Sequence, residues 1–194
     1  MSHETGNILL PIARACIARA LGRTTEAPET EPWLQDLGAS FVTLTQEGQL
    51  RGCIGSLHAY RSLLEDVKAN ALAAALQDPR FAPLAADELD RTEIEISLLS
   101  ALQPMQFFSE ADAIAQLRPG VDGVVLEFGN YRSTFLPQVW EQLPAAEEFL
   151  AHLKRKAGLP VRFWAPELKL SRYTVRKFKE SQRQSAGAAQ PARA

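Results

Sequence analysis

The sequence contains little sulfur and few histidines, and this bounds its chemistry. Its 194 residues include two cysteines, Cys16 and Cys53, and three histidines. Two cysteines cannot supply the set of disulfides that staples many small secreted domains. No Cys-x-x-Cys, His-Glu-x-x-His or cluster-binding cysteine triplet occurs, and these are the usual patterns for metal ions and iron–sulfur clusters. We therefore expect no metal and no cofactor, so that any sulfur chemistry belongs to a single thiol.

Charge of one sign and long apolar runs are also lacking. The chain has 21 Lys and Arg against 23 Asp and Glu, a formal net charge of -2, so it has no general attraction to phosphate backbones or anionic lipid. No apolar run approaches the roughly 20 residues that span a bilayer. The first residues show neither the basic nor the apolar region of a secretory signal. We expect a cytosolic protein that binds neither nucleic acid nor membrane.

Hydrophobic periodicity predicts a mixture of helices and strands. The predicted helices span residues 7–21, 62–78, 109–117 and 145–157, and the predicted strands span residues 41–45, 50–57, 93–100, 123–128, 131–136 and 168–178. Ser62 and Glu65 form a capping box at the start of the second helix, and Pro11 fits the first helix only if it lies in the first turn. Because the strands do not alternate regularly with helices, we expect an α+β fold with antiparallel hairpins.

The length fits a single domain with its own core. We place this domain at residues 1–180. Residues 181–194 are small and polar, and we predict a disordered tail there.

Cys53 is the residue most open to a chemical interpretation. It lies in the predicted strand between Gly52 and Gly55, and glycines in a strand often mark a bulge or a close approach of a ligand or backbone. This predicts a small pocket beside the thiol. Alternation places Arg51 on the same face, about 7 Å away, where a guanidinium favours the thiolate if the site is partly shielded.

A carboxylate could orient that guanidinium. In the predicted strand of residues 93–100, Glu95 points away from Ile94 and Ile96, so Glu95 could pair with Arg51 if the two strands are neighbours. Cys53, Arg51 and Glu95 are therefore the candidate catalytic residues. The structural alternative is that Cys53 packs as a small hydrophobe, as most free cysteines do, and we expect Cys16 to do so on the apolar face of its helix.

The hexapeptide Leu50-Arg-Gly-Cys-Ile-Gly55 resembles the sequence that marks the AMMECR domain family, known as protein A of the AmmeMemoRadiSam gene clusters. Further blocks agree with the family in the same order between Ile8 and Glu180. They are Phe41-Val-Thr-Leu44, Asp78-Pro-Arg-Phe81 with Pro83-Leu84, Ile94-Glu-Ile-Ser97, Leu136-Pro-Gln-Val139 and Lys156-Ala-Gly-Leu159.

The resemblance implies a mostly antiparallel sheet with flanking helices in two lobes. The larger lobe would come from both chain ends, the smaller from the middle, with a cleft between them. Asp78, Arg80, Phe81 and Gln138 could line this cleft and bind a substrate together with the two glycines. Each also has a plain structural explanation, since Asp-Pro ends a helix, Arg80 suits a surface ion pair and Gln138 follows a strand terminus.

The family has no established substrate, and two functions remain open. The first is an enzyme or enzyme component with a Cys53 thiolate, acting with a Memo-like protein and a radical SAM enzyme, the partners that shared gene clusters imply. Its weak point is that no histidine lies next to the cysteine in the sequence. The second is a binding or adaptor module that uses the cleft to hold a small molecule or peptide, in which Arg51 fixes an anion and Cys53 packs.

Overall fold

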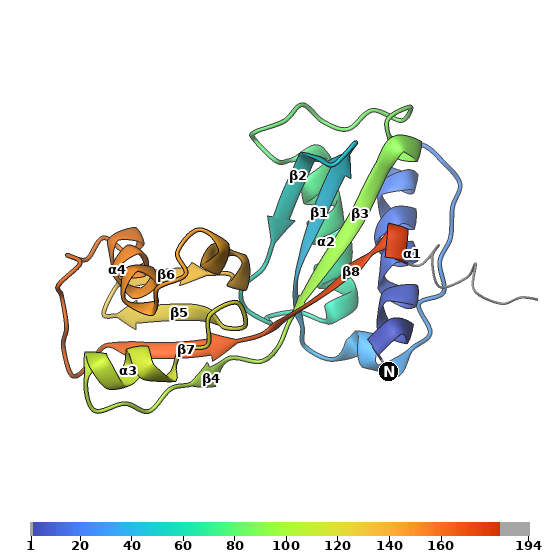
Figure 1. Cartoon of the computed structure of the whole chain (residues 1–194). Helices are drawn as coiled ribbons and strands as arrows, with labels where there is room; N and C mark the ends of the chain where they lie inside the picture. The colour runs from blue at the N-terminus through green and yellow to red at the C-terminus, as the bar shows by residue number, and fades with distance from the viewer. Residues whose placement is uncertain (1, 183–194) are drawn as a thin grey trace, which may run out of the picture. The chain divides into compact units, whose positions relative to one another are not determined.

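The computed structural model describes residues 2–182 and has the α+β fold predicted from the sequence (Figure 1). The helices are α1 (Ser2–Ala20), α2 (Leu63–Leu76), α3 (Glu110–Gln116) and α4 (Ala146–Lys156), with short 3-10 helices η1 (Pro32–Gln35), η2 (Leu89–Arg91) and η3 (Pro137–Glu141). The strands are β1 (Ala39–Gln46), β2 (Gln49–Gly55), β3 (Thr92–Leu99), β4 (Gln103–Pro104), β5 (Gly123–Phe128), β6 (Tyr131–Phe135), β7 (Lys169–Tyr173) and β8 (Val175–Lys179). None of the helices among these residues is both long and apolar enough to cross a membrane.

The chain forms two compact units, each with its own four-stranded sheet. The first unit contains residues 2–99 and 176–182, and its strand order is β2-β1-β3-β8. The second contains residues 100–175, with the order β4-β7-β5-β6. The single strand predicted over residues 168–178 is wrong: it is two strands, β7 in the second sheet and β8 in the first. Of the predicted disordered tail, residues 183–194 lie outside the described residues, and Ser181 and Gln182 continue a helical turn from Glu180.

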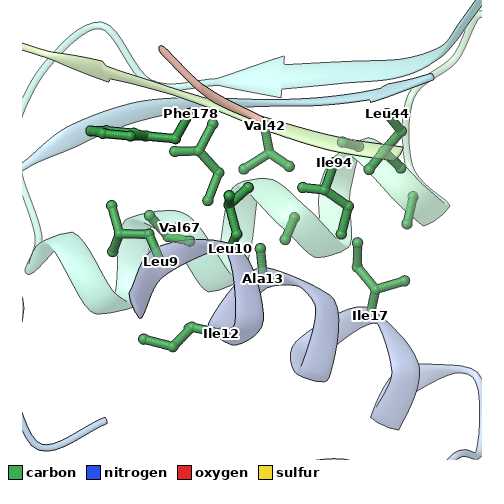
Figure 2. Close-up of a cluster of buried hydrophobic side chains, with 14 of the residues drawn as sticks. Leu9, Leu10, Ile12, Ala13, Ile17, Val42, Leu44, Val67, Ile94 and Phe178 are labelled. Atoms are coloured by element: carbon green, nitrogen blue, oxygen red, sulfur yellow. The ribbon is translucent and has the colours of Figure 1, made fainter. Parts of the chain in front are cut away.

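Helices α1 and α2 cover one face of the first sheet (Figures 1 and 2). Val42 and Leu44 of β1 and Ile94 and Ile96 of β3 are fully buried in this cluster. Because side chains alternate along a strand, the residues between them point to the opposite face. The sheet therefore has a mainly apolar face against the helices and a second face that carries most of its polar side chains.

Helix α1 begins earlier than its hydrophobic pattern indicates. It starts at Ser2, so Pro11 lies near its middle. The prediction that the helix can hold Pro11 only in its first turn is therefore wrong. A proline there removes one backbone hydrogen bond. The helix is held instead by packing, since Leu9, Leu10 and Ile17 are completely buried against the sheet and α2, and packing supplies most helical stability in proteins.

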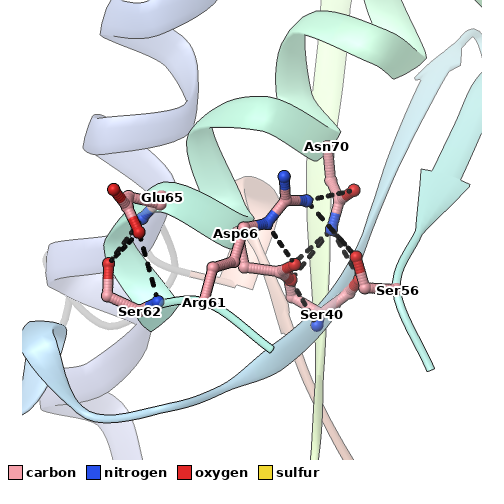
Figure 3. A network of polar contacts seen from close by, with 7 residues as sticks. All are labelled: Ser40, Ser56, Arg61, Ser62, Glu65, Asp66 and Asn70. Atoms are coloured by element: carbon pink, nitrogen blue, oxygen red, sulfur yellow. Dashed lines mark hydrogen bonds and ion pairs between the residues drawn. The ribbon is translucent and has the colours of Figure 1, made fainter. Parts of the chain in front are cut away.

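A buried polar network joins α2 to the strands (Figure 3). Asp66 is completely buried, and its Oδ2 accepts hydrogen bonds from Ser40 N, Ser40 Oγ and Asn70 Nδ2 at 2.7–2.9 Å. Arg61 Nε donates to Asp66 Oδ1 at 2.9 Å, and Asn70 also donates to Ser40 O and to Ser56 Oγ. The Asp66 carboxylate thus fixes the start of β1 to α2, and Asn70 ties Ser56, which follows β2, to the same helix. The sequence did not show this network, although the predicted capping box of Ser62 and Glu65 is confirmed.

Replacing Asp66 with alanine should strongly destabilise the protein. The change leaves the hydrogen-bond donors of Ser40 and the Arg61 guanidinium without their carboxylate partner. Breaking a buried charge pair costs about 3 kcal/mol or more. We expect the urea midpoint of unfolding to fall accordingly. The same change at the exposed Asp36 should alter the free energy of unfolding by less than about 0.5 kcal/mol. Equal effects of the two substitutions would contradict the structural role given to Asp66.

The second unit has a separate aromatic and aliphatic core. Trp140 stacks on Phe149 of α4, with ring centroids 3.8 Å apart, and β5 and β7 contribute further buried side chains. Lys154 of α4 is completely buried, and its ammonium group pairs with Glu110 and donates to Val161 O at 3.2 Å. Lys154 therefore belongs to the core, whereas the next two residues, Arg155 and Lys156, are exposed at the helix end.

Candidate functional site

Cys53 lies on β2, at the edge of the first sheet. It pairs with Thr43 of β1, and its Sγ is 3.3 Å from Thr43 Oγ1. Because Thr43 stands between the buried Val42 and Leu44, both side chains point to the sheet face opposite α1 and α2. Cys53 as a residue is half-buried, so it is neither sealed in the apolar core nor fully in solvent.

An aspartate and an arginine hold the backbone of Cys53. Asp78 Oδ2 accepts from Cys53 N at 2.9 Å, and Arg80 Nη2 donates to Cys53 O at 3.1 Å. Arg80 also binds the Asp78 carboxylate through Nε at 2.9 Å and Nη2 at 2.7 Å. Unpaired N–H and C=O groups along a sheet edge need covering, and here the two side chains take the place of a neighbouring strand. We call Asp78 and Arg80 the edge clamp.

The edge clamp is charged at neutral pH. The hydrogen bonds from Arg80 hold the pKa of the Asp78 carboxyl well below its usual range, with help from the backbone N–H groups of Cys53 and Arg80 and against the effect of burial. The hydrogen bond to Asp78 correspondingly raises the pKa of Arg80, and attraction to Cys53 adds to this in a smaller measure.

Arg51 does not extend toward Glu95 as predicted. Its Nε and Nη2 donate to Glu88 at 3.1 and 3.0 Å, and its Nη1 donates to Ala82 O at 2.9 Å. The hydrogen bond from Arg51 lowers the pKa of Glu88 to about 2. Leu44 of β1 pairs with Gly52, and Thr45 pairs with Leu50. Arg51 has no partner in this register and is the extra residue of a β-bulge. A bulge redirects the side chain it carries, so strict alternation misplaced this guanidinium.

Glu95 lies across the sheet from Cys53. Thr43 pairs with Cys53 on one side and with Glu95 of β3 on the other, so β1 separates the thiol from the carboxylate by about 10 Å, two strand spacings. Glu95 instead forms an ion pair with Lys179 of β8 at 3.1 Å and lies 3.8 Å from Lys177. The predicted pairing of Glu95 with Arg51 is wrong for this reason.

The two glycines beside Cys53 make room for the protein itself. A Cβ atom on Gly52 would lie 2.2 Å from the carbonyl oxygen of Ala74 in α2, and one on Gly55 would lie 2.2 Å from the ring of Phe41. Gly52 therefore lets β2 approach the helix, and Gly55 lies beneath an aromatic ring from β1. The small pocket predicted from these glycines is filled by these neighbours.

The remaining candidates divide between the two units. Asp78 and Arg80 lie beside Cys53, and the half-buried Phe81 lies against Arg80, with its ring centroid 5.4 Å from Arg80 Cζ. Gln138 is exposed on η3 in the second unit. Within residues 2–182, no three His, Cys, Asp or Glu side chains are grouped closely enough to hold a metal ion.

Sequence reasoning overlooked two members of the site, Thr43 and Glu88. Thr43 was visible as the polar position in an apolar strand, but its register with Cys53 depends on the bulge. Glu88 is distant in sequence from Arg51, and no periodic pattern connects them. Chemically, the arrangement presents a partly exposed thiol on a fixed backbone, with one hydroxyl at hydrogen-bonding distance.

Replacing Glu88 with glutamine should reduce the acid sensitivity of the fold. The pKa of Glu88 is lowered from 4.5 to about 2, so its contribution to stability is present above about pH 4.5 and is lost as the pH falls through the folded value. Urea unfolding of the wild type at a series of pH values should show a loss of stability over this window, and Glu88→Gln should show a smaller loss.

Asp87→Asn is the matched control, because Asp87 is the exposed neighbour of Glu88. It should keep the wild-type dependence on pH between about 5 and 2, because removing one exposed surface charge has little effect on stability. An unchanged slope in Glu88→Gln would show that the Arg51–Glu88 pair does not stabilise the folded state.

Taken with the fold, this site defines a class: α+β proteins with two antiparallel sheets and a strand cysteine held by an Asp-x-Arg turn. The family model described as AMMECR1 matches residues 10–178. A protein of Methanothermobacter thermautotrophicus is 37% identical over 190 residues, covering 93% of this chain and 96% of that protein. A protein of Thermococcus gammatolerans is 37% identical over 194 residues, covering 93% of this chain and 92% of that protein. The chain belongs to the AMMECR1 family, as the resemblance predicted.

A solved structure supports the same assignment. The crystal structure of an uncharacterised protein from Pyrococcus horikoshii is 33% identical, has a TM-score of 0.78 and matches over 93% of each chain. The names of these three relatives state no activity. The chemistry must therefore be inferred from the site.

Proposed function

We propose that this chain is a cysteine-dependent enzyme, or a component of one, in which the sulfur of Cys53 reacts as a thiolate. The supporting observation is that a half-buried cysteine has its Sγ 3.3 Å from a hydroxyl, while the edge clamp binds both its backbone N–H and its backbone C=O. A cysteine that only filled space would need neither an opening to solvent nor this rigid support. Reactive cysteines are partly exposed and lie in electropositive surroundings, and here the Arg80 guanidinium is the positive group beside Cys53.

The edge clamp contributes rigidity more than charge. Asp78 and Arg80 form an ion pair that is neutral as a whole, so it fixes the position of Cys53 without a large net field. Catalytic groups depend on this kind of support from the residues around them. The Arg80 guanidinium also lies next to Cys53, since its Nη2 donates to Cys53 O at 3.1 Å. In this proposal Arg80 and Thr43 take the supporting roles that the sequence suggested for Arg51 and Glu95.

A binding or adaptor module is the second candidate, and the polar face of the first sheet favours it. Glu95, Lys177 and Lys179 form ion pairs beside Thr43 on that face, and mixed charges suit a small polar molecule or a peptide. Cys53 would then only pack against Thr43. The further proposal that a Memo-like protein and a radical SAM enzyme are partners of this chain is supported by the family resemblance.

The pH dependence of thiol alkylation separates the two candidates. The rate of reaction of Cys53 with iodoacetamide, followed by mass spectrometry of the Cys53 peptide, should reach half its maximum well below pH 8.5, about the pKa of a free thiol. Cys16 is an internal reference, because burial raises the pKa of its thiol and should keep it unreactive while the protein is folded. A midpoint at or above the free-thiol value, or no reaction at Cys53, would exclude the thiolate proposal.

Two substitutions test whether the sulfur is needed for function. Cys53→Ser and Cys53→Ala should both fail to complement a strain that lacks the protein, because neither side chain supplies a thiolate. Cys16→Ala, which removes the other sulfur, should complement. Full activity of both Cys53 variants would leave Cys53 with a packing role and favour the binding module.

A further inference from the structure

The two cysteines have different hydrogen-bond partners. Cys16 Sγ lies 3.7 Å from the carbonyl oxygen of Lys68, and a carbonyl oxygen only accepts, so this contact requires a protonated thiol. Cys53 Sγ lies 3.3 Å from the hydroxyl of Thr43, where either atom could be the donor. Of the two partners, only the hydroxyl can donate a hydrogen bond to a thiolate.

The sheet fixes the hydroxyl of Thr43 against the sulfur. The N–H and C=O groups of Cys53 bind Asp78 and Arg80 and so point away from β1. Thr43 and Cys53 are then a pair without mutual backbone hydrogen bonds, the kind in which side chains approach most closely. Threonine is also stiff at χ1, and its neighbours Val42 and Leu44 are fully buried. The contact thus follows from the register and does not depend on a mobile side chain.

We propose that Thr43 is a positioning residue that donates its hydroxyl hydrogen to the sulfur of Cys53 and stabilises the thiolate. This inference rests on the proposed function, in which the thiolate is the reacting form. The proton of the thiol leaves to solvent, while Thr43 keeps its own proton and changes no covalent bond. Hydrogen bonds strengthen when the acceptor is ionised, so the contact favours the charged sulfur over the neutral one.

Three variants test the direction of this hydrogen bond. Thr43→Val removes the hydroxyl and keeps the branched shape, whereas Thr43→Ser keeps the hydroxyl. Thr45→Val is the control: it makes the same change two residues along the strand, where the hydroxyl forms a hydrogen bond with Glu93. Iodoacetamide alkylation of Cys53 is measured across pH for each. Thr43→Val should raise the midpoint by about one pH unit and slow the reaction near pH 7 about tenfold. The other two should stay close to the wild type.

The charged groups around Cys53 are the same in all three variants. Asp78 and Arg80 bind its backbone, Arg51 precedes it on β2, and Glu95 lies beyond Thr43. Urea unfolding of each variant shows whether the fold is kept, and valine is well suited to a strand position. A shift in Thr43→Val without loss of stability therefore reports on the hydroxyl.

The outcomes separate this inference from the proposed function. A midpoint that stays in place or falls in Thr43→Val overturns the inference, because the thiol would then be the donor or the contact would not matter. An ordinary midpoint in the wild type that still rises in Thr43→Val supports the hydrogen bond and refutes the thiolate enzyme. No reaction of Cys53 in the wild type overturns both, and a full shift in Thr45→Val also overturns the inference.

Discussion

The bond between the Asp78 carboxylate and the Cys53 amide is the constraint on which the site depends. Among residues 2–182, no strand lies beyond β2 at this edge of the sheet, and Asp78 and Arg80 supply partners for the N–H and C=O groups of Cys53. The same contacts determine which way Cys53 faces. With its backbone groups turned outward, its side chain stands next to Thr43, and the sulfur acquires a fixed position and a hydroxyl neighbour.

The opposite face of the sheet explains why the site is placed where it is. Helices α1 and α2 cover one face, and Gly52 lets β2 come within contact distance of Ala74 in α2. Every second residue of the strands is thereby committed to the core. The polar residues between them, Thr43 and Cys53 among them, are displayed on the other face, where a partly exposed thiol is compatible with a stable fold.

The sequence predicted the fold class, the capping box of α2 and most strands because these depend on local periodicity. It did not predict the partner of Arg51, since the bulge that redirects this side chain depends on the pairing of two strands. The buried Asp66 and Asn70 were missed for a similar reason: their partners come from elements far along the chain. Family resemblance pointed to Asp78 and Arg80, and the structure supplies the physical reason for their presence beside the cysteine motif.

Membership of the AMMECR1 family does not fix an activity, and thiol chemistry at Cys53 is our proposal for this site. The most direct test of the account is the hydrogen exchange of the Cys53 amide in the wild type and in Asp78→Ala. The account predicts a protected amide in the wild type, despite its place at a sheet edge, and rapid exchange in the variant. Rapid exchange of this amide in the wild type would contradict the account, because the backbone of Cys53 would not be held by Asp78.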